Sequence, residues 1–275
     1  MEEKYTGYKI LTLDDYGMND FYAGQLVCDD LCENQYVIIE NKNHEAVDYY
    51  RFTKGNLQKV KYPVLGSEYT GEMKPRNPQQ YCAMDLLKQK EIPLKLITGN
   101  FGSGKSMMCI IAALEALQNG DFERIIFVRN NVQVKDTDPL GALPGDQFDK
   151  TLPYLAPFAD HCGGFEGLQQ LVDRDKLEVI PLAFLRGRSI RNSIIYSMES
   201  ENLTKEHIQL IMGRVDQDSQ LWMDGDFKQR DKTAFDKSKG LETMVERLKG
   251  ESLFGYVHLI KSERSKVAAL ADKLD

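Results

Sequence analysis

Residues 99–106 read Gly-Asn-Phe-Gly-Ser-Gly-Lys-Ser and complete the Gly-x-x-x-x-Gly-Lys-Ser pattern of a phosphate-binding loop. Glycines let the backbone curl so that several N–H groups point at one phosphate. The Lys105 ammonium would reach the β- and γ-phosphates, and the Ser106 hydroxyl is an oxygen ligand suited to Mg²⁺. The pattern therefore predicts binding of a nucleoside triphosphate, taken as ATP, together with Mg²⁺. The residues expected to contact the nucleotide at this loop are Gly99, Asn100, Phe101, Gly102, Ser103, Gly104, Lys105, Ser106 and Met107.

The segments on either side of this loop follow the order that the motif requires. Residues 94–98 alternate like a short strand, and residues 107–117 are rich in Met, Ile, Ala and Leu, which favour a helix. A helix that begins at the loop would aim the positive end of its dipole at the phosphates. The alternative interpretation is a glycine-rich turn with a surface lysine, which the order of strand, loop and helix disfavours.

Strand-like runs recur beyond the loop, with helical stretches between most of them. These runs cover residues 124–128, 177–180, 193–197, 220–223 and 256–260. The alternation predicts an α/β fold with a mostly parallel, doubly wound sheet that binds its ligand beyond the carboxyl ends of the strands. Residues 136–167 are rich in Pro, Gly and Asp, so we expect an excursion from the sheet that contacts a substrate or a neighbouring subunit.

The chain ahead of the loop divides into two regions. Short β-rich runs at 8–13 and 35–40 are separated by Asp, Asn and Gly turns. Residues 66–78 are polar, contain two prolines and show no clear periodicity. We therefore expect a small β-rich accessory module at 1–65, a linker at 66–78 and a nucleotide-binding domain at 79–275.

Composition places the chain among ordinary globular proteins. Of the 275 residues, 42% are hydrophobic and 28% are charged, and no run of eighteen apolar residues suggests a membrane span. The first residues lack the basic and apolar blocks of a signal peptide, so a cytoplasmic location is expected. Five cysteines at irregular spacings argue against a disulfide framework. The net charge of −7 argues against a strongly basic nucleic-acid coat, although a local groove can still be positive.

Several further signatures occur in a fixed order along the chain. They are Arg76-Asn77-Pro78-Gln79-Gln80, the phosphate loop, Val128-Arg129-Asn130, Leu143-Pro144-Gly145-Asp146, Leu185-Arg186-Gly187-Arg188-Ser189, Glu199-Ser200-Glu201-Asn202-Leu203-Thr204 and Gly225-Asp226-Phe227-Lys228-Gln229. In that order they resemble the PhoH family of ATPases, from about Pro75 to the C-terminus. The part before Pro75 resembles the region that links nuclease and ATPase in PIN-PhoH fusion proteins. No PIN nuclease is expected in this sequence, so cleavage of RNA by this chain alone is not implied.

The resemblance carries expectations about fold and function. The family resembles the first ATPase core of superfamily 1 helicases, and its fused members are described as RNA helicases that assemble as hexameric rings. It therefore implies an ATP-driven machine that acts on RNA or another single-stranded nucleic acid. Because no second helicase motor domain fits after the core, the resemblance also implies a homo-oligomer, such as a hexamer, in which a neighbouring subunit completes each ATP site.

The resemblance also assigns roles around the nucleotide. Gln80 would read the adenine edge, since a side-chain amide can donate and accept together; the alternative is a solvated glutamine at a helix start. Asp226 and Gln229 would lie near the γ-phosphate, where Gln229 senses the phosphate or orients water, although Gly-Asp is also common in plain turns. Glu199 would polarise the attacking water as general base.

Arginines form a second group of assigned residues. Arg186 and Arg188 flank Gly187 after a strand and would grip phosphate or a nucleic-acid backbone, as would Arg129; the alternative is solvated loop arginines. Arg214, and after it Arg264, are candidates for a charge-stabilising arginine finger that acts in its own subunit or in a neighbour. Three aromatic residues of the excursion are candidates for base stacking, although local packing is the favoured interpretation: Tyr154, Phe158 and Phe165.

One departure from the family pattern bears on catalysis. After the strand at 193–197 the family reads Asp-Glu-Ala-Gln-Asn, whereas this chain reads Met-Glu-Ser-Glu-Asn from Met198. A thioether is a poor partner for Mg²⁺, which prefers oxygen. Hydrolysis is therefore expected to be either weakened or near normal, the latter if Glu201 or Asp226 holds the metal instead. A third interpretation of Met198 is core filler at a strand end.

Two functions from different classes follow. The first is an ATPase coupled to RNA or another single-stranded nucleic acid, whose turnover the nucleic acid would raise. The second is a regulatory or scaffold protein that binds nucleotide with little hydrolysis and recruits a partner through its β-rich module. A small-molecule kinase ranks last, because it leaves the signatures at Arg186–Arg188 and Gly225–Gln229 unexplained.

Overall fold

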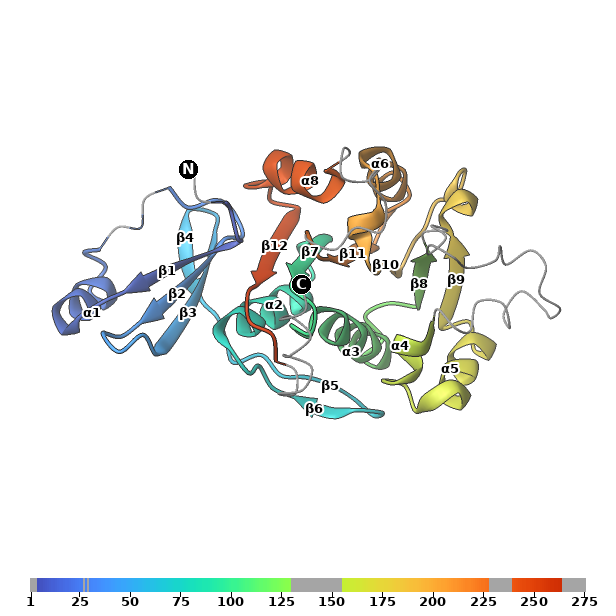
Figure 1. The fold of residues 1–275 in the computed structure, drawn as a ribbon, viewed down its shortest axis with the longest axis horizontal. Coiled ribbons are helices and arrows are strands. Elements are labelled where there is room, and N and C mark those ends of the chain that lie inside the picture. The colour runs from blue at the N-terminus through green and yellow to red at the C-terminus, as the bar shows by residue number, and fades with distance from the viewer. Residues whose placement is uncertain (1–3, 27, 29, 130–154, 228–238, 264–275) are drawn as a thin grey trace, which may run out of the picture.

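A six-stranded parallel sheet lies at the centre of the chain (Figure 1). The computed structural model describes residues 4–26, 28, 30–129, 155–227 and 239–263. In sequence order the strands of this sheet are β7 (Leu94–Gly99), β8 (Arg124–Arg129), β9 (Leu177–Pro181), β10 (Ser193–Ser197), β11 (Gln220–Gly225) and β12 (Phe254–Leu259). Their spatial order is β12-β7-β11-β10-β8-β9, and every pair is parallel. The strand that precedes the phosphate loop, β7, is therefore second from the edge of the sheet, between β12 and β11.

Helices cover both faces of this sheet (Figure 1). One face carries α2 (Pro78–Lys88), α3 (Lys105–Gln118), α4 (Ala156–Ala159) and α5 (Gly164–Asp173). The other carries η3 (Leu182–Leu185), α6 (Lys205–Met212) and α8 (Gly240–Leu248), while η4 (Ser200–Asn202) follows β10. The predicted α/β fold with a doubly wound parallel sheet is thus confirmed, and it is that of a P-loop nucleoside triphosphatase.

The strand β10 shows why this sheet forms. Its residues Ile194, Ile195 and Tyr196 are all fully buried, although they alternate between the two faces. Ile194 and Tyr196 join the cluster that includes α3, whereas Ile195 joins the cluster that includes α6. A strand covered on both faces has to be apolar throughout, which is why these runs read as continuous hydrophobic segments.

The N-terminal module is a four-stranded sheet with one helix. Its elements are β1 (Tyr8–Thr12), α1 (Asp15–Tyr22), β2 (Tyr36–Glu40), β3 (Ala46–Thr53) and β4 (Asn56–Lys59), and the strand order is β1-β2-β3-β4. The predicted β-rich module is therefore present, but α1 was not expected from the sequence. Asp14 starts this helix by accepting a hydrogen bond from the Gly17 N–H group at 2.8 Å.

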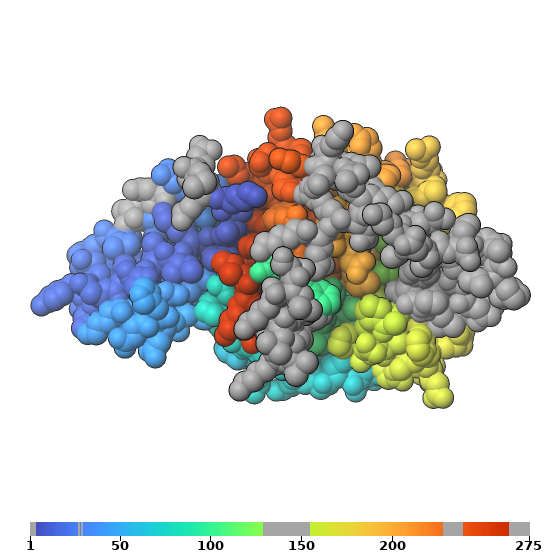
Figure 2. Space-filling model, in the orientation of Figure 1, coloured from blue at the N-terminus to red at the C-terminus, as the bar shows by residue number. Residues whose placement is uncertain are grey.

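The module packs directly against α2 and β12, and Figure 2 shows it as the blue lobe beside the red segment. The Asn34 side-chain amide donates to the backbone oxygens of Ser252 (2.9 Å) and Phe254 (3.0 Å). Tyr36 donates to the Asp85 carboxylate of α2 at 2.7 Å, and Tyr36 is fully buried. These contacts join the module and the α/β body into one continuous core.

The predicted linker at 66–78 contains regular structure. Strands β5 (Leu65–Ser67) and β6 (Gly71–Met73) form a hairpin that packs on α3, and the Gly66 N–H group donates to Glu115 at 2.8 Å. The short strands are too brief to produce a periodicity that could be recognised in the sequence. The domain boundary at 66–78 stays a prediction.

The predicted excursion at 136–167 is described only from residue 155 onward. Its described end returns to the core: Leu155 and Phe158 are fully buried. The Phe158 ring packs edge-on against Phe127 at 5.4 Å and against Tyr196 at 5.9 Å between ring centroids. The packing interpretation of Phe158 is therefore confirmed, whereas Phe165 is exposed and Tyr154 lies outside the described residues.

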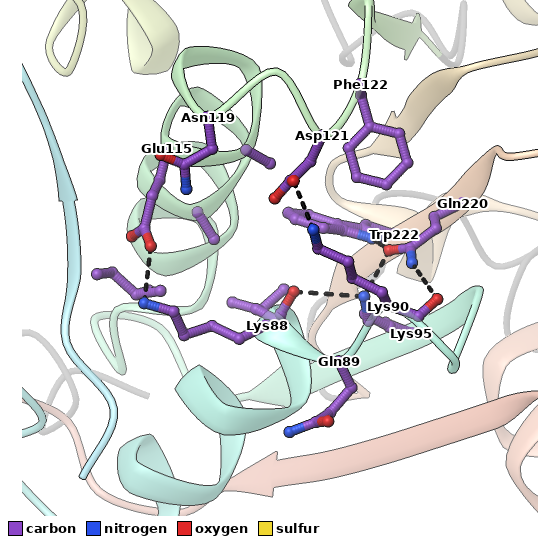
Figure 3. Close-up of a pocket in the computed structure, with 14 residues that line it drawn as sticks. Lys88, Gln89, Lys90, Lys95, Glu115, Asn119, Asp121, Phe122, Gln220 and Trp222 are labelled. Carbon is purple, nitrogen blue, oxygen red and sulfur yellow. Dashed lines mark hydrogen bonds and ion pairs between the residues drawn. The ribbon is translucent and has the colours of Figure 1, made fainter. Parts of the chain in front are cut away.

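A cavity of about 310 Å³ opens at the amino end of β7, between the ends of α2 and α3 (Figure 3). The phosphate loop lies at the other end of this strand. Lys95 lies against it and is 1% exposed. Its ammonium contacts the Gln220 side-chain oxygen, the Leu87 backbone oxygen at 3.3 Å and the Trp222 ring at 4.8 Å. Burial holds the pKa of Lys95 well below its ordinary value.

Replacement of this buried lysine should stabilise the fold. We expect Lys95→Met to raise the free energy of unfolding at pH 7 by about 1 to 3 kcal/mol, because it removes a costly buried ammonium. Because the pKa of Lys95 is lower in the folded chain, the unfolded chain binds a proton at this lysine more tightly than the folded chain does. The native protein should therefore gain stability as pH rises toward 10.5. The Met variant should lack this pH dependence.

Denaturant unfolding at pH 7 and pH 9.5 measures both effects. Lys90→Met is the matched control, because Lys90 lies on the rim of the same cavity with a side chain that is 71% exposed. The control should change stability by less than about 0.5 kcal/mol. A loss of stability in Lys95→Met would contradict this account and show that the contacts with Gln220 and Trp222 outweigh desolvation.

Candidate nucleotide-binding site

The loop at 99–106 connects β7 to α3 at the carboxyl edge of the sheet. Gly102 and Gly104 have φ angles of +77° and +86°, which other residues adopt with strain. α3 begins at Lys105 with no side-chain cap within the described residues, so its first N–H groups face the loop. The Ser103 hydroxyl is buried and has no hydrogen-bond partner there. Backbone donors, a helix N-terminus and a lysine thus converge on one cradle, which fits a polyphosphate.

Neighbouring segments hold this loop closely. A Cβ atom added at Gly99 would lie 2.6 Å from the Leu259 backbone oxygen of β12, so only glycine fits there. The Glu263 N–H group donates to the Gly102 oxygen at 3.0 Å, and Asn77 at the start of α2 donates to the Glu263 carboxylate at 2.8 Å. The loop is therefore fixed by α2 and by the segment that follows β12. Phe101, at its tip, is about half exposed.

Gln80, on α2, holds the backbone of this loop through a hydrogen bond from its side-chain amide. It is 1% exposed, and its amide nitrogen donates to the Ser103 backbone oxygen at 3.0 Å. Its amide oxygen accepts from the Arg76 N–H group at 2.9 Å. Both ends of the amide are thus bonded to backbone, and Gln80 is not a solvated glutamine. Adenine recognition by Gln80 stays a prediction and would require the amide to exchange these partners.

The carboxylate that lies deepest at this edge is Asp224, near the end of β11, which was not among the residues predicted from the sequence. It is fully buried. Its two oxygens accept from the Tyr196 hydroxyl at 2.6 Å and from the Glu199 N–H group at 2.8 Å. The Ser106 hydroxyl lies close enough to the same carboxyl to lower its pKa by hydrogen bonding, although burial has the larger effect and raises that pKa overall.

Met198 follows β10 and is half-buried. It packs against the apolar cluster that contains Tyr196 and α3, which is consistent with its interpretation as core filler at a strand end. A thioether in this environment provides no oxygen for a metal ion. The oxygen ligands suited to Mg²⁺ at this edge are the Ser106 hydroxyl and the carboxylates, so the residues present fit the ion that accompanies a nucleotide. No group of three or more His, Cys, Asp and Glu side chains that could hold a metal occurs in the described part of the chain.

Glu199 is held in an unusual backbone conformation. Its φ angle is +52°, in the left-handed region, and its side chain is exposed at the edge where the loop lies. Such strain persists only where surrounding contacts enforce it, and here the Glu199 N–H group is fixed by Asp224. The geometry turns the glutamate out of the strand direction and leaves its carboxylate accessible.

Glu201 and Asp226 form a second pair of acidic residues at this edge. Asp226 is 4% exposed, and its N–H group donates to the Glu201 carboxylate at 3.1 Å. Burial, with a smaller contribution from the neighbouring Asp224, raises the pKa of Glu201 to about 8. The Glu201 carboxylate thus supports the turn after β11, and metal binding by Glu201 or Asp226 stays a prediction.

The partly buried Glu201 predicts that the stability of the fold depends on pH. Its raised pKa means that the folded chain binds a proton more tightly than the unfolded chain, so its contribution is largest below pH 4.5 and is lost as pH rises toward 8. We expect Glu201→Gln to stabilise the fold by about 2 to 4 kcal/mol at pH 8, at about 1.4 kcal/mol for each pKa unit. Unfolding measured at pH 5 and 8 tests this, with the exposed Glu206→Gln as control. Equal stability of variant and native chain at pH 8 would contradict it.

Two of the arginines assigned from the family resemblance, Arg188 and Arg214, lie at the edge of the sheet opposite the phosphate loop. Arg188 pairs with Glu178 near the start of β9, at 2.8 and 3.2 Å, and its backbone oxygen accepts from Arg214 at 3.3 Å. Arg186 is exposed nearby. Strands of five or six residues place this edge about 15 Å or more from the loop. The structure therefore does not bring Arg188 or Arg214 to the phosphate loop of the same chain.

Three of the predicted site residues lie wholly or partly outside the described part of the chain. Gln229 and Arg264 lie outside the described residues. Arg129 ends β8, at the same edge as the loop, but only its backbone is described. The sequence pattern found Lys105, Ser106 and Glu199 at the expected edge, whereas it overlooked Asp224. The signal available for Asp224 was an acidic residue at the end of an apolar strand run, at Met223-Asp224-Gly225.

Fold and site together define a P-loop nucleotide-binding protein, and comparison with known proteins makes this more specific. Residues 72–272 match the PhoH-like protein family. Protein PhoH2 of Bacillus subtilis is 30% identical over an alignment that covers 99% of this chain and 65% of that protein. Protein PhoH2 of Thermobispora bispora is 32% identical, over 77% of this chain and 49% of that protein. Protein PhoH of Escherichia coli is 30% identical, over 72% and 56% respectively.

The chain belongs to the PhoH-like protein family, a family of P-loop ATPases. It spans about half to two thirds of the length of these curated relatives. None of the helices that the structure describes combines the length and apolar character needed to cross a bilayer.

Proposed function

We propose that this chain is a Mg²⁺-dependent ATPase whose turnover is coupled to RNA or another single-stranded nucleic acid. The observation that carries the ATPase part is the placement of Lys105, Ser106 and Glu199 at one sheet edge around a glycine cradle. Family membership supports ATP as the nucleotide. The cytoplasmic location expected from the sequence belongs to this proposal.

The chemistry at this edge divides between binding and hydrolysis. The loop N–H groups, the α3 N-terminus and Lys105 would hold the β- and γ-phosphates by charge-assisted hydrogen bonds. Ser106 would hold Mg²⁺, which neutralises phosphate charge when bound. Glu199, exposed beside the loop, would accept a proton from the attacking water. Asp226 and Gln229 would respond to the γ-phosphate.

An oligomer follows from the position of the arginines. Phosphoryl transfer commonly uses an arginine finger, yet Arg188 and Arg214 lie at the edge away from the loop of their own chain. We propose that a neighbouring copy supplies this charge, as in a ring that the family resemblance suggests to be hexameric. Arg129 and Arg186 are proposed to contact the nucleic-acid backbone.

The test is steady-state ATP hydrolysis by the purified chain with Mg²⁺, with and without single-stranded RNA, across protein concentration. The proposal expects RNA to raise turnover and activity to rise with assembly. Arg214→Ala should lose activity that equimolar mixing with Lys105→Ala subunits partly restores, because each variant supplies what the other lacks. ATP turnover that RNA leaves unchanged would overturn the coupling to nucleic acid.

A second candidate function rests on Met198. Its thioether packs in the apolar cluster at the position where the family holds an aspartate, which favours a regulatory or scaffold protein that binds ATP and hydrolyses it slowly or not at all. Tight ATP binding with turnover that appears only in Met198→Asp would support this second function. Turnover in the native chain as fast as that of Met198→Asp would exclude it.

A further inference from the structure

The ends of β10 and β11 lie side by side at the phosphate-loop edge. The two strands are paired in parallel up to Ser197 and Met223, so the next residues, Met198 and Asp224, lie at the same level. Side chains at the same level of paired parallel strands point to the same face. That face is the one covered by α3, since Tyr196 and Trp222, two residues earlier, both belong to its cluster. Asp224 is therefore one strand away from Met198, about 5 Å.

The strand of Asp224 is nearer to the phosphate loop than the strand of Met198 is. In the sheet order, β11 lies between β10 and β7, the strand that leads into the loop. A carboxylate on β11 is thus nearer to Ser106 than one at the same level of β10 would be. The side-chain contact between Asp224 and Ser106 agrees with this placement.

The Asp224 carboxylate retains bonding capacity. Its oxygens accept hydrogen bonds from Tyr196 and from the Glu199 N–H group, at 2.6 and 2.8 Å, and the Ser106 hydroxyl is a third neighbour, whereas a carboxylate offers about four lone-pair sites. The group is fully buried, and a buried carboxylate without a positive charge nearby is costly. Lys105 supplies part of that charge, and its influence on the pKa of Asp224 is smaller than that of burial.

We propose that Asp224 performs the metal-holding role that Met198 cannot, so that Mg²⁺ at the nucleotide is held by Ser106 together with a carboxylate moved from β10 to β11. This rests on the proposed function of the site as an ATPase. In this proposal Met198 serves only in packing. The methionine at the position where the family has an aspartate then means that the metal ligand has moved to the neighbouring strand. Tyr196 and the Glu199 N–H group orient the Asp224 carboxylate, which also ties the metal ligand to the backbone of the proposed general base.

The experiment measures nucleotide affinity with and without the metal, which does not depend on turnover. Isothermal titration calorimetry gives the Kd of a non-hydrolysable ATP analogue in Mg²⁺ and in EDTA for the native chain and for Asp224→Asn. The native chain should bind more tightly in Mg²⁺. The asparagine keeps the shape and one acceptor oxygen, and it should reduce the Mg²⁺-dependent gain by about tenfold or more while affinity in EDTA is unchanged or improved.

The matched control is Asp85→Asn. Asp85 is a partly buried carboxylate whose pKa is likewise raised by burial, and it accepts a hydrogen bond from a buried tyrosine, Tyr36, at 2.7 Å. It lies on α2, however, and this bond joins it to the N-terminal module. This variant should keep the full Mg²⁺-dependent gain. The double variant Met198→Asp/Asp224→Asn returns a carboxylate to the end of β10 and should recover part of that gain. If Asp224→Asn alone unfolds, this double variant still tests whether Asp224 is the metal ligand.

The outcomes separate the two proposals. A Mg²⁺-dependent gain that survives in folded Asp224→Asn would overturn the assignment of Asp224 while leaving the ATPase intact. A folded double variant without recovery would also overturn it, since a relocated ligand should be replaceable from the neighbouring strand. If the native chain binds no nucleotide in either condition, the proposed function itself fails.

Discussion

Lys105→Ala should abolish ATP hydrolysis and weaken ATP binding by about a hundredfold or more. The lysine lies at the first position of α3, directly after the glycine cradle, and its ammonium would make charge-assisted contacts with two phosphates in a water-poor site. Calorimetry with ATP analogues and a phosphate-release assay measure the two effects separately. Because Lys105 is only partly buried and belongs to neither of the two large apolar clusters, thermal stability without nucleotide should change little.

Two comparisons make this result specific to the loop. Lys88→Ala, at the end of α2, removes a partly exposed lysine that pairs with Glu115 and should leave ATP binding unchanged. ADP, which lacks the γ-phosphate, should lose less affinity in Lys105→Ala than the triphosphate does. Full ATP turnover in the folded Lys105→Ala variant would show that the glycine loop is not the nucleotide site.

Glu199→Gln should separate binding from catalysis. A positioned general base contributes about 10²- to 10⁴-fold, and the amide cannot accept the proton, so kcat should fall by that factor. ATP affinity should be retained, because Glu199 contacts Asp224 through its backbone N–H group, which the substitution leaves in place. A single-turnover experiment on ATP-loaded protein measures the chemical step directly.

The control for this variant is Glu246→Gln, an exposed glutamate on α8 at a distance from the loop. It should hydrolyse ATP at the native rate. If Glu199→Gln turns over ATP as fast as the native chain, the general base is another residue. If it loses ATP binding as well, the strained turn at φ +52° depends on the carboxylate, and the division of roles is wrong.

Much of the ATP-binding body could be predicted because its signals are local. The pattern at 99–106 fixes a loop, a strand before it and a helix after it, and the buried strands read as apolar runs that need no partner to be recognised. The helix α1 and the hairpin at Leu65–Met73 were not predicted, since their short polar segments depend on contacts such as that between Gly66 and Glu115.

The candidate site shows the same limit. Lys105 and Ser106 belong to one continuous motif, so their proximity follows from the sequence. Asp224 is more than a hundred residues away, and its meeting with Ser106 depends on β11 being inserted between β7 and β10. Strand order of this kind is set by packing across the whole sheet and leaves no local pattern. The position of Arg214 at the opposite edge follows from the same topology.

The most direct test of the central claim is Mg²⁺-dependent release of phosphate from ATP by the native chain, in which Met198 is present. We expect turnover in Mg²⁺ that disappears in EDTA and in Lys105→Ala, because Ser106, Asp224 and Glu199 together supply the ligands and the base that Met198 does not. If the native chain binds ATP in Mg²⁺ but releases no phosphate, with or without RNA and at every concentration, the site is not that of a working ATPase.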